Sequence, residues 1–368
     1  MLTAGDEYPI HQTPEPIAFS GSDRNFYDRY FFNGYSQDGS VFFGGAFGVY
    51  PHLNVMDGAV SFLKDGKQRS LHLSRCLHME RMDTRVGPMK IEVVEPLKSV
   101  RLILEETEGL ALDVTFTGRA FPIEEPRFTR RQGPRMLMDV TRMTQNGFWE
   151  GEMSVDGEAI KVEGFLGTRD RSWGVRPIGA ADAQPLTPPL PPQFYWIWTP
   201  LNFGDRAVYF HVNDDGEGNS WNTKAMMVMD GATADGLTHM SECSCEVTYV
   251  PGTRRAAKGV ISMKDEAGNA YSVELTPRDQ FQMKGIGYTH PSWGHGTFHG
   301  DQVAWEREDF VPADLPWQDP SNLHIQAISK AVLTCPDGSK HEGIGSFEQL
   351  FMGPHAPSGF KDLFDPAS

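Results

Sequence analysis

Four charged side chains and a tryptophan are crowded into one glycine-bounded segment of the chain, Gly167 to Arg176. A carboxylic acid that burial keeps protonated can donate a proton to a substrate, and an indole face can stabilise a cation. The neighbouring arginines oppose this chemistry, because a nearby guanidinium favours the ionised carboxylate. Asp170 is therefore either a proton donor beside Trp173 or one half of a structural ion pair, and the sequence leaves both alternatives open.

A predicted β-hairpin over residues 153–166 positions this segment. Its turn is Asp156-Gly157, and Asp-Gly supplies the positive φ angles that tight hairpins need. Strict alternation from Val162 carries Asp170 onto the apolar face of the second strand. Trp173 then falls on the opposite face, unless a flanking glycine forms a bulge that turns the chain.

A second group of candidates lies in two consecutive predicted strands, Phe194 to Pro200 and Arg206 to Val212. Aromatic residues, Tyr195 and Trp196 among them, alternate over both faces of the first strand. Ordinary core packing produces this pattern, and so does the wall of a ligand cavity. In the next strand His211 alternates with aliphatic residues, so we expect it either to relay protons or to be an ordinary hydrogen-bonded histidine.

Histidine is densest between Gly285 and Glu306, where His290, His295 and His299 accompany Trp293. The spacing of four and then three residues would align three zinc ligands on a helix. Proline and glycine interrupt this stretch repeatedly and exclude a regular helix. We therefore expect no metal here, and weigh a rim of ligand-contacting residues, with His295 as a proton relay, against plain loop structure.

The rest of the chain reads as short strands separated by Asp-Gly and Asn-Gly turns, which is typical of antiparallel sandwiches and barrels. The strongest break in composition is Pro177 to Gln193, whose prolines cannot pair in a sheet. Because 368 residues exceed what one hydrophobic core usually spans, we predict two all-β domains, 1–192 and 193–368.

Composition limits the partners. A formal net charge of −16 argues against nucleic acid and against anionic membrane surfaces. No apolar run is long enough to span a membrane, the first residues lack a secretory signal pattern, and the four cysteines form no disulfide framework. We expect a cytoplasmic protein without a nucleotide cofactor, since no phosphate-binding or dinucleotide motif is present. The sequence is compatible with a homodimer and does not decide the oligomeric state.

The segment Gly-x-Arg-Asp-x-Ser-Trp-Gly-x-Arg, followed by the aromatic strand Phe194 to Trp198, resembles the double-lipocalin family of carotenoid 1,2-hydratases, kievitone hydratase and lipocalin-like Diels–Alderases. The C-terminal Gly345-x-x-Glu348 and Gly353 to Pro357 resemble a bacterial branch of that family. The resemblance implies two lipocalin-like antiparallel β-barrel domains in tandem. Hydratase-like members carry histidine where this chain has Arg171, and arginine cannot shuttle protons near neutral pH.

These observations predict an enzyme that acts without a cofactor on a hydrophobic, unsaturated small molecule such as a terpenoid or polyketide. The reaction would be hydration, dehydration, isomerisation or cyclisation. The predicted catalytic residues are Asp170, His211 and His295, and the predicted substrate contacts are Arg171, Trp173, Arg176, Tyr195, Trp196 and Trp293. The alternative is a lipocalin-like carrier of an apolar ligand, which the missing motif histidine favours.

Overall fold

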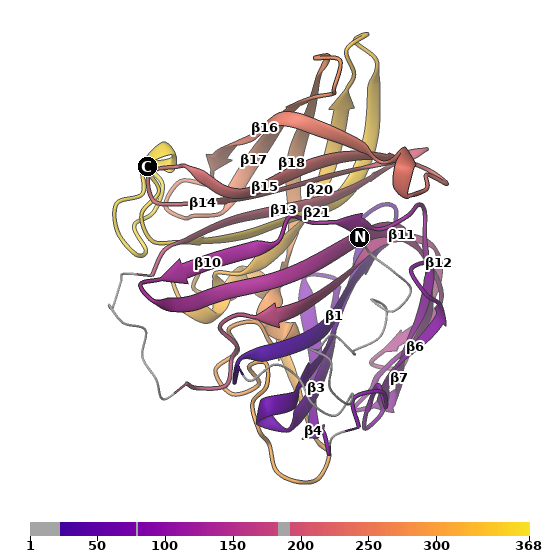
Figure 1. The fold of residues 1–368 in the computed structure, drawn as a ribbon. Helices are drawn as coiled ribbons and strands as arrows, with labels where there is room; N and C mark the ends of the chain where they lie inside the picture. Colours follow the sequence, from indigo (N-terminus) through magenta and orange to yellow (C-terminus); the bar gives the residue numbers. More distant parts are fainter. Residues whose placement is uncertain (1–22, 79, 183–191) are drawn as a thin grey trace. The chain divides into compact units, whose positions relative to one another are not determined.

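The computed structural model describes residues 23–78, 80–182 and 192–368, and these residues form strands joined by turns and single 3-10 turns (Figure 1). They divide into two compact units. The first contains described residues 23–182 together with Lys284–Val311, and the second contains residues 192–283 together with Pro312–Ser368. The all-β, lipocalin-like prediction is confirmed.

In the first unit, the described strands form one curled antiparallel sheet in the order β19-β4-β3-β2-β1-β12-β11-β8-β7-β6-β5, with β9 and β10 paired to β11. The strands are β1 Phe26–Tyr35, β2 Val41–Tyr50, β3 Val55–Lys64, β4 Lys67–Cys76, β5 Arg85–Val86, β6 Met89–Glu95, β7 Ser99–Thr107, β8 Leu110–Gly118, β9 Ile123–Glu124, β10 Phe128–Gln132, β11 Arg135–Val155, β12 Glu158–Val175 and β19 Ala304–Phe310.

In the second unit, the described strands close into a barrel in the order β13-β14-β15-β16-β17-β18-β20-β21. They are β13 Phe194–Phe203, β14 Arg206–Asp214, β15 Ser220–Met229, β16 Thr238–Tyr249, β17 Ala256–Lys264, β18 Ala270–Gln282, β20 Ile325–Thr334 and β21 Lys340–Met352. The 3-10 turns of the chain are η2 Pro51–Leu53, η3 Ala234–Gly236, η4 Met283–Ile286, η5 Pro312–Asp314, η6 Pro320–Asn322 and η7 Ala356–Ser358.

Large apolar side chains fill the concave side of each unit. In the first, Trp149 packs edge-on against Phe32 and Phe43, and its indole N–H donates to the carbonyl of Asn33 at 2.8 Å. In the second, alternate residues of β13 and β14 point into the barrel, including Ile197 and Phe210. The alternate residues of these strands, among them Trp196 and His211, lie on the other face and are also buried.

The late segment 284–311 belongs to the first unit, because β19 pairs with β4 from Ala304 opposite Ser74 to Phe310 opposite Gln68. The predicted boundary between residues 192 and 193 stays a prediction, and the proline-rich connection that suggested it lies largely outside the described residues, as does the N-terminal stretch 1–22. Among the described residues, none of the helical segments is long and apolar enough to cross a membrane.

Candidate functional site

The motif residues of β12 do not follow the alternation between the two faces of the sheet that the sequence predicted. The Asp156-Gly157 hairpin forms as expected, but β12 carries a bulge at Gly164, which has a left-handed φ of 59°. The bulge shifts the alternation by one residue, so that Val162 and Phe165 both enter the core. Asp170 therefore lies on the face opposite the core, which corrects the prediction.

Asp170 forms a buried ion pair there. The Nη2 atom of Arg142 lies 2.9 Å from a carboxylate oxygen of Asp170, whose side chain is 7% exposed. The Nε atom of Arg142 also lies 3.4 Å from Glu125, which is fully buried. Two carboxylates thus share one guanidinium, and this arrangement supports the structural alternative for Asp170.

Arg171 points to the concave side of the same sheet. Its Nη2 atom lies 2.8 Å from Asp28, both side chains are wholly buried, and the guanidinium lies 3.8 Å from the centre of the Tyr30 ring. Trp173 is half-buried and stands opposite Asp28 in the pairing of β1 with β12. Side chains of the motif therefore form ion pairs on both faces of the sheet, Asp170 with Arg142 on one face and Arg171 with Asp28 on the other.

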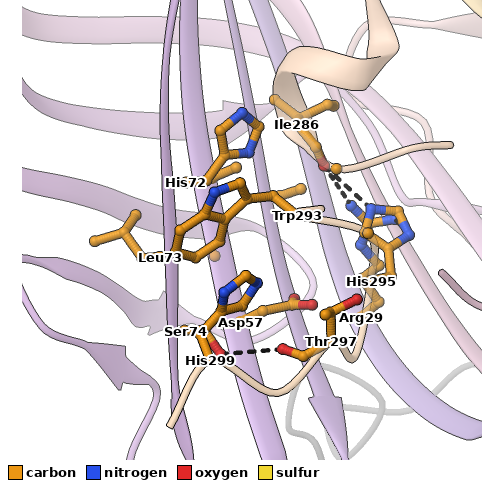
Figure 2. Close-up of a pocket in the computed structure, with 15 residues that line it drawn as sticks. Arg29, Asp57, His72, Leu73, Ser74, Ile286, Trp293, His295, Thr297 and His299 are labelled. Atoms are coloured by element: carbon orange, nitrogen blue, oxygen red, sulfur yellow. Dashed lines mark hydrogen bonds between the residues drawn. The ribbon is translucent and has the colours of Figure 1, made fainter. Parts of the chain in front are cut away.

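A pocket opens on the convex face of the first unit, where small residues leave room beside β2 and β3 (Figure 2). Ala46, Gly58 and Ala59 form its floor, and segment 284–311 supplies the opposite wall. The space enclosed within the hollow is about 10 Å³, which holds about one water molecule, so a larger ligand would lie in its open mouth. The polar and aromatic residues around it are Arg29, Asp57, His72, Ser74, Trp293, His295, Thr297 and His299.

His295 is held as the neutral tautomer that carries its proton on Nε2. Arg29 donates to His295 Nδ1 at 3.0 Å, and Arg176 donates to the same atom at 3.3 Å. A guanidinium can only donate, so Nδ1 accepts. The Nε2 atom lies 3.1 Å from the carbonyl oxygen of Ile286 and donates to it, as Figure 2 shows. These contacts suit His295 to positioning the two arginines.

Asp57 is the strongest candidate acid. Burial raises the pKa of its carboxyl from 3.8 to about 6, against the lowering effects of the Arg29 charge, the Gly296 N–H and the Tyr50 hydroxyl. The Gly296 N–H donates to the carboxyl at 2.7 Å and so ties the wall segment to β3. The residue retains partial solvent contact and lines the pocket. A carboxyl that titrates near neutrality within reach of a ligand can act as a general acid.

Three stacked rings form an aromatic wall. The Trp293 ring lies between His299, at a centroid distance of 3.7 Å, and His72, at 5.9 Å. The Trp293 N–H donates to Glu306 at 2.6 Å, which fixes the indole plane. Burial lowers the pKa of His72 and that of His299, so both rings are neutral near pH 7. The Trp293 ring is therefore packed between two imidazoles, and the three rings hold one another in place beside the hollow.

His72, His290 and Glu308 bring three ligand-type atoms within 4.8 Å of one another. His290 Nδ1 accepts the backbone N–H groups of Ser292 and Trp293, at 3.1 and 2.8 Å. The neutral His290 ring therefore carries its proton on Nε2, which points at Glu308 at 3.4 Å. A metal would need that lone pair, so the hydrogen bonds favour a His–Glu cluster over a metal centre.

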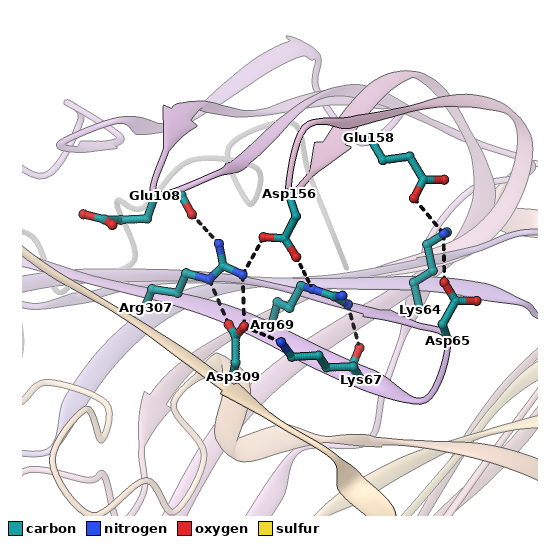
Figure 3. Close-up of polar contacts among 9 residues, drawn as sticks. All are labelled: Lys64, Asp65, Lys67, Arg69, Glu108, Asp156, Glu158, Arg307 and Asp309. Carbon is teal, nitrogen blue, oxygen red and sulfur yellow. Dashed lines mark hydrogen bonds and ion pairs between the residues drawn. The ribbon is translucent and has the colours of Figure 1, made fainter.

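An ion-pair network fixes the strand that follows this wall (Figure 3). Arg307 of β19 binds Asp156 at 2.7 Å and Asp309 at 2.8 Å, and it donates to the carbonyl of Glu108. Arg69 of β4 binds the other oxygen of Asp156 at 2.7 Å. The network joins β19 to the hairpin turns of β7–β8 and β11–β12.

Tyr195, Trp196 and His211 belong to the barrel unit. Tyr195 points into the barrel, where its ring stacks on Phe351 at 4.5 Å, and burial raises its pKa well above the usual value. His211 accepts from the Tyr209 hydroxyl at 2.7 Å and donates to the Asn222 side-chain oxygen at 2.5 Å. These contacts match the hydrogen-bonded alternative for His211.

Trp196 contributes to a buried polar cluster around Glu348. Its indole N–H and His324 Nε2 both lie 2.8 Å from one carboxylate oxygen, and the Gln326 amide donates to the other at 2.6 Å. Burial raises the pKa of Glu348, but these donors outweigh burial and leave the pKa lowered. The cluster holds an ionised carboxylate without solvent.

Among the predicted site residues, the structure thus gathers His295, Trp293 and Arg176 around the pocket of the first unit. Sequence reasoning missed Arg29, Asp57 and His72. Arg29 and Asp57 are charged residues in strands rich in apolar side chains, FYDRYFF and VMDGAVSFL, and His72 stands between Leu71 and Leu73; these interruptions were the available signal.

The sequence matches a family of unknown function, DUF8625, over residues 2–361. The chain belongs to this family. The comparison of the DUF8625 sequence with curated proteins finds no match.

Solved structures share the fold of this DUF8625 protein. Kievitone hydratase from Nectria haematococca matches at a TM-score of 0.53 and 10% identity, over 88% of each chain. CghA, a Diels–Alderase, matches at 0.53 and 11%, over 90% of each chain. A protein provisionally assigned as AttH, from Nitrosomonas europaea, matches at 0.53 and 14%, over 94% of this chain and 98% of its own. The predicted resemblance to the lipocalin-like hydratase family is confirmed at the level of fold.

Proposed function

We propose that this DUF8625 protein is an enzyme that works without a cofactor on a hydrophobic, unsaturated small molecule, by hydration, dehydration, isomerisation or cyclisation. The observation that carries the proposal is the Asp57 carboxyl, whose pKa of about 6 places a proton donor beside the aromatic wall of the pocket. The hydratase and Diels–Alderase that share the fold support this class of reaction.

In the proposed reaction the Asp57 O–H bond breaks and a C–H bond forms at an alkene carbon of the substrate. The positive charge left on the neighbouring carbon is attracted to the Asp57 carboxylate, which becomes negative as its proton leaves. Water then attacks the cation and loses a proton to the Asp57 carboxylate, which restores the acid. Loss of a neighbouring C–H proton to the Asp57 carboxylate instead gives an isomer. Attack by an internal alkene gives a ring and a new cation, which then loses a proton to the same carboxylate.

The proposal assigns the other pocket residues to positioning. Arg29, Arg176 and His295 hold one another through the contacts on His295 Nδ1, and Trp293 contacts the substrate. The catalytic roles predicted for Asp170 and His211, and the substrate contacts predicted for Arg171, Trp173, Tyr195 and Trp196, stay predictions.

The test uses a panel of conjugated polyenes and prenylated phenols, incubated with the protein in buffer made with ¹⁸O-labelled water. Mass spectrometry detects labelled hydration products, unlabelled dehydration products and isomers. Asp57→Asn removes the donated proton at nearly constant size, and we expect turnover to fall about 100-fold or more. Asp65→Asn makes the same chemical change at an 80% exposed side chain and serves as the control. Unchanged turnover by Asp57→Asn would refute the assignment.

A carrier of an apolar ligand is the second candidate, because His295 and His211 have both ring nitrogens engaged and Arg171 replaces the motif histidine. Native mass spectrometry of protein purified from its source distinguishes the two. A co-purified ligand that is released unchanged after prolonged incubation supports the carrier.

A further inference from the structure

Four histidines meet in the wall of the pocket, and the structure keeps each of them uncharged. Three lie in the loop between η4 and β19, residues 287–303, which we call the wall loop, and the fourth lies on β4. They are His290, His295, His299 and His72, of which Figure 2 shows the last three. Free histidine changes its charge near pH 6.5. A wall that packs only around neutral imidazoles is therefore sensitive to acid.

The hydrogen bonds of His290 leave no place for a second ring proton. Its Nδ1 atom accepts the backbone N–H groups of Ser292 and Trp293, at 3.1 and 2.8 Å. In an imidazolium both ring nitrogens are donors, so a protonated His290 would point an N–H at these two N–H groups. Protonation of His290 would therefore break the turn that positions Trp293.

His295 has two cations at the nitrogen that would take up the proton. Its Nδ1 atom accepts from Arg29 at 3.0 Å and from Arg176 at 3.3 Å, and its Nε2 atom donates to the carbonyl of Ile286. A proton on Nδ1 would face both guanidinium groups at hydrogen-bond distance, and like charges disfavour it. His295 therefore stays neutral for as long as the wall loop lies against Arg29.

Burial opposes the charging of the other two rings. The His72 side chain is 2% exposed, and burial lowers its pKa although Glu308 acts to raise it. Burial likewise lowers the pKa of His299, against the raising effects of a backbone hydrogen bond and of Glu306. The two rings lie on either side of Trp293, so charging them would disturb the stack.

The charges around the four rings are mixed, and their sum does not cancel the preference for neutral imidazoles. The carboxylates of Glu306 and Glu308 favour a charged ring, but burial outweighs them at His72 and His299. Asp57 has the opposite effect on the wall, because its raised pKa means that the closed wall binds its proton more tightly. The groups that surround the rings include Glu306, Glu308, Asp57, Arg29, Arg176, Lys284 and Tyr288.

The wall loop is attached to the first unit through single contacts rather than through a strand ladder. The Gly296 N–H donates to Asp57 at 2.7 Å, the Ala180 N–H donates to the carbonyl of His295 at 3.0 Å, and the Ser74 hydroxyl donates to the carbonyl of Thr297 at 3.4 Å. The strand that follows, β19, pairs with β4 along its whole length. Opening of the loop therefore requires less free energy than unfolding of the sheet.

We propose that the wall loop is an acid-operated gate: below about pH 6 its histidines take up protons and the loop leaves the sheet, while β19 and the barrel stay folded. The closed hollow holds about one water molecule, so opening gives larger ligands access to Asp57 and to the pocket floor. The inference rests on the proposed function only in treating the hollow as the active site, because opening itself needs no substrate.

The size of the effect follows from the number of protons taken up. A histidine that is neutral in the closed wall and titrates near pH 6.5 in the open one favours opening by up to about eightfold between pH 7 and pH 5.5. Asp57, with a pKa of about 6 in the closed wall, opposes opening by about fourfold over the same interval. Two histidines against Asp57 already give about 16-fold, so we expect an increase of at least about tenfold in the opening equilibrium.

The test is hydrogen exchange of the full-length protein at pH 7 and pH 5.5, with exchange times scaled for the intrinsic rate. The reporting amides are those of Trp293, Gly296 and Ala180, which bond within the loop or between it and the sheet. Their protection should fall at least about tenfold in acid, whereas that of β13 to β21 should stay constant. Equal protection of these amides at both pH values, or a loss that the barrel shares, would overturn the gate.

A matched pair of variants identifies the responsible ring. In His290→Asn the side-chain oxygen can still accept the two backbone N–H groups but cannot become charged, so the acid response should shrink by up to about eightfold. His239→Asn makes the same change at an exposed histidine of the barrel unit and should keep the full response. A full response in folded His290→Asn would contradict the assignment.

The unaltered protein supplies a second measurement in case His290→Asn does not fold. Long-range ¹H–¹⁵N spectra of the histidine rings should show His290 and His295 with the proton on Nε2 down to the pH at which the loop loses protection. A charged His290 or His295 ring in a loop that is still protected would refute the gate.

Failure of the gate and failure of the proposed function give different results, because exchange is measured without substrate. Protection that does not depend on pH, together with turnover that depends on Asp57, removes the gate alone. Acid opening together with turnover that is independent of Asp57 removes the proposed acid alone. Asp57→Asn should also increase the acid response by up to about fourfold, since asparagine cannot take up the proton that favours the closed wall.

Discussion

Replacing Asp57 by asparagine should change the pH dependence of folding stability in a defined direction. Burial raises the pKa of the folded-state carboxyl from 3.8 to about 6. Between these values the unfolded chain has lost its proton and the folded protein keeps it, so stability falls as pH rises. About two pH units at about 1.4 kcal/mol each give about 3 kcal/mol. The residue retains some solvent contact, so we expect about 2 kcal/mol.

Asparagine cannot ionise, so Asp57→Asn escapes this loss. The variant's free energy of unfolding minus that of the wild type should rise by about 2 kcal/mol between pH 4 and pH 7 and stay constant above. Urea unfolding followed by tryptophan fluorescence at half-unit pH steps measures the difference, and Asp65→Asn, at an exposed hairpin turn, should show a nearly constant one. A flat or falling difference for Asp57→Asn would refute a raised pKa of Asp57 and, with it, the assignment of Asp57 as the proton donor.

Three further predictions concern the framework. Gly174→Ala should lower the free energy of unfolding, measured by thermal denaturation, by more than about 2 kcal/mol. The φ angle of Gly174 is 133°, and a Cβ atom there would lie 2.1 Å from a backbone oxygen of β11. Unchanged stability would show that the end of β12 adjusts to the added methyl group. Glu348→Gln should cost about 2 to 3 kcal/mol in urea unfolding, since the amide brings a donor among three donors; unchanged stability would mean the donors have other acceptors. Arg307→Ala should cost about 1 kcal/mol at low salt and less at 1 M salt; a salt-independent loss would point to packing.

The strand pattern predicted an antiparallel sandwich or barrel, because hairpin turns and strand alternation are local, and the family resemblance selected the lipocalin-like barrel. Asp156 and Gly157 adopt the positive φ angles, 53° and 84°, that the Asp-Gly pair indicated. The face of Asp170 was predicted wrongly, because a single left-handed residue at Gly164 shifts the alternation. The same strand also contains Gly167 and Gly174, and nothing local marks which glycine forms the bulge.

The candidate site was predicted in part. Trp293 and His295 stood out because aromatic and histidine residues cluster in a glycine-rich stretch. Asp57 and Arg29 did not, since their chemistry comes from neighbours far along the chain. Gly296, which donates to Asp57, lies 239 positions away, and His295 lies 266 positions from Arg29. Only the register of β1 to β4 and the return of segment 284–311 bring these groups together.

The return of segment 284–311 to the first unit has a consequence for synthesis on the ribosome. Until Phe310 has left the exit tunnel, β4 is an edge strand with an unpaired row of backbone groups, and the pocket lacks one wall. The barrel strands β13 to β18 are translated before β19, so the sheet of the first unit cannot be completed until most of the barrel unit has been synthesised. The unpaired backbone groups of an exposed edge strand can pair with strands of other chains, which leads to aggregation. A nascent chain of this protein therefore depends on protection of β4 until its own last strand arrives.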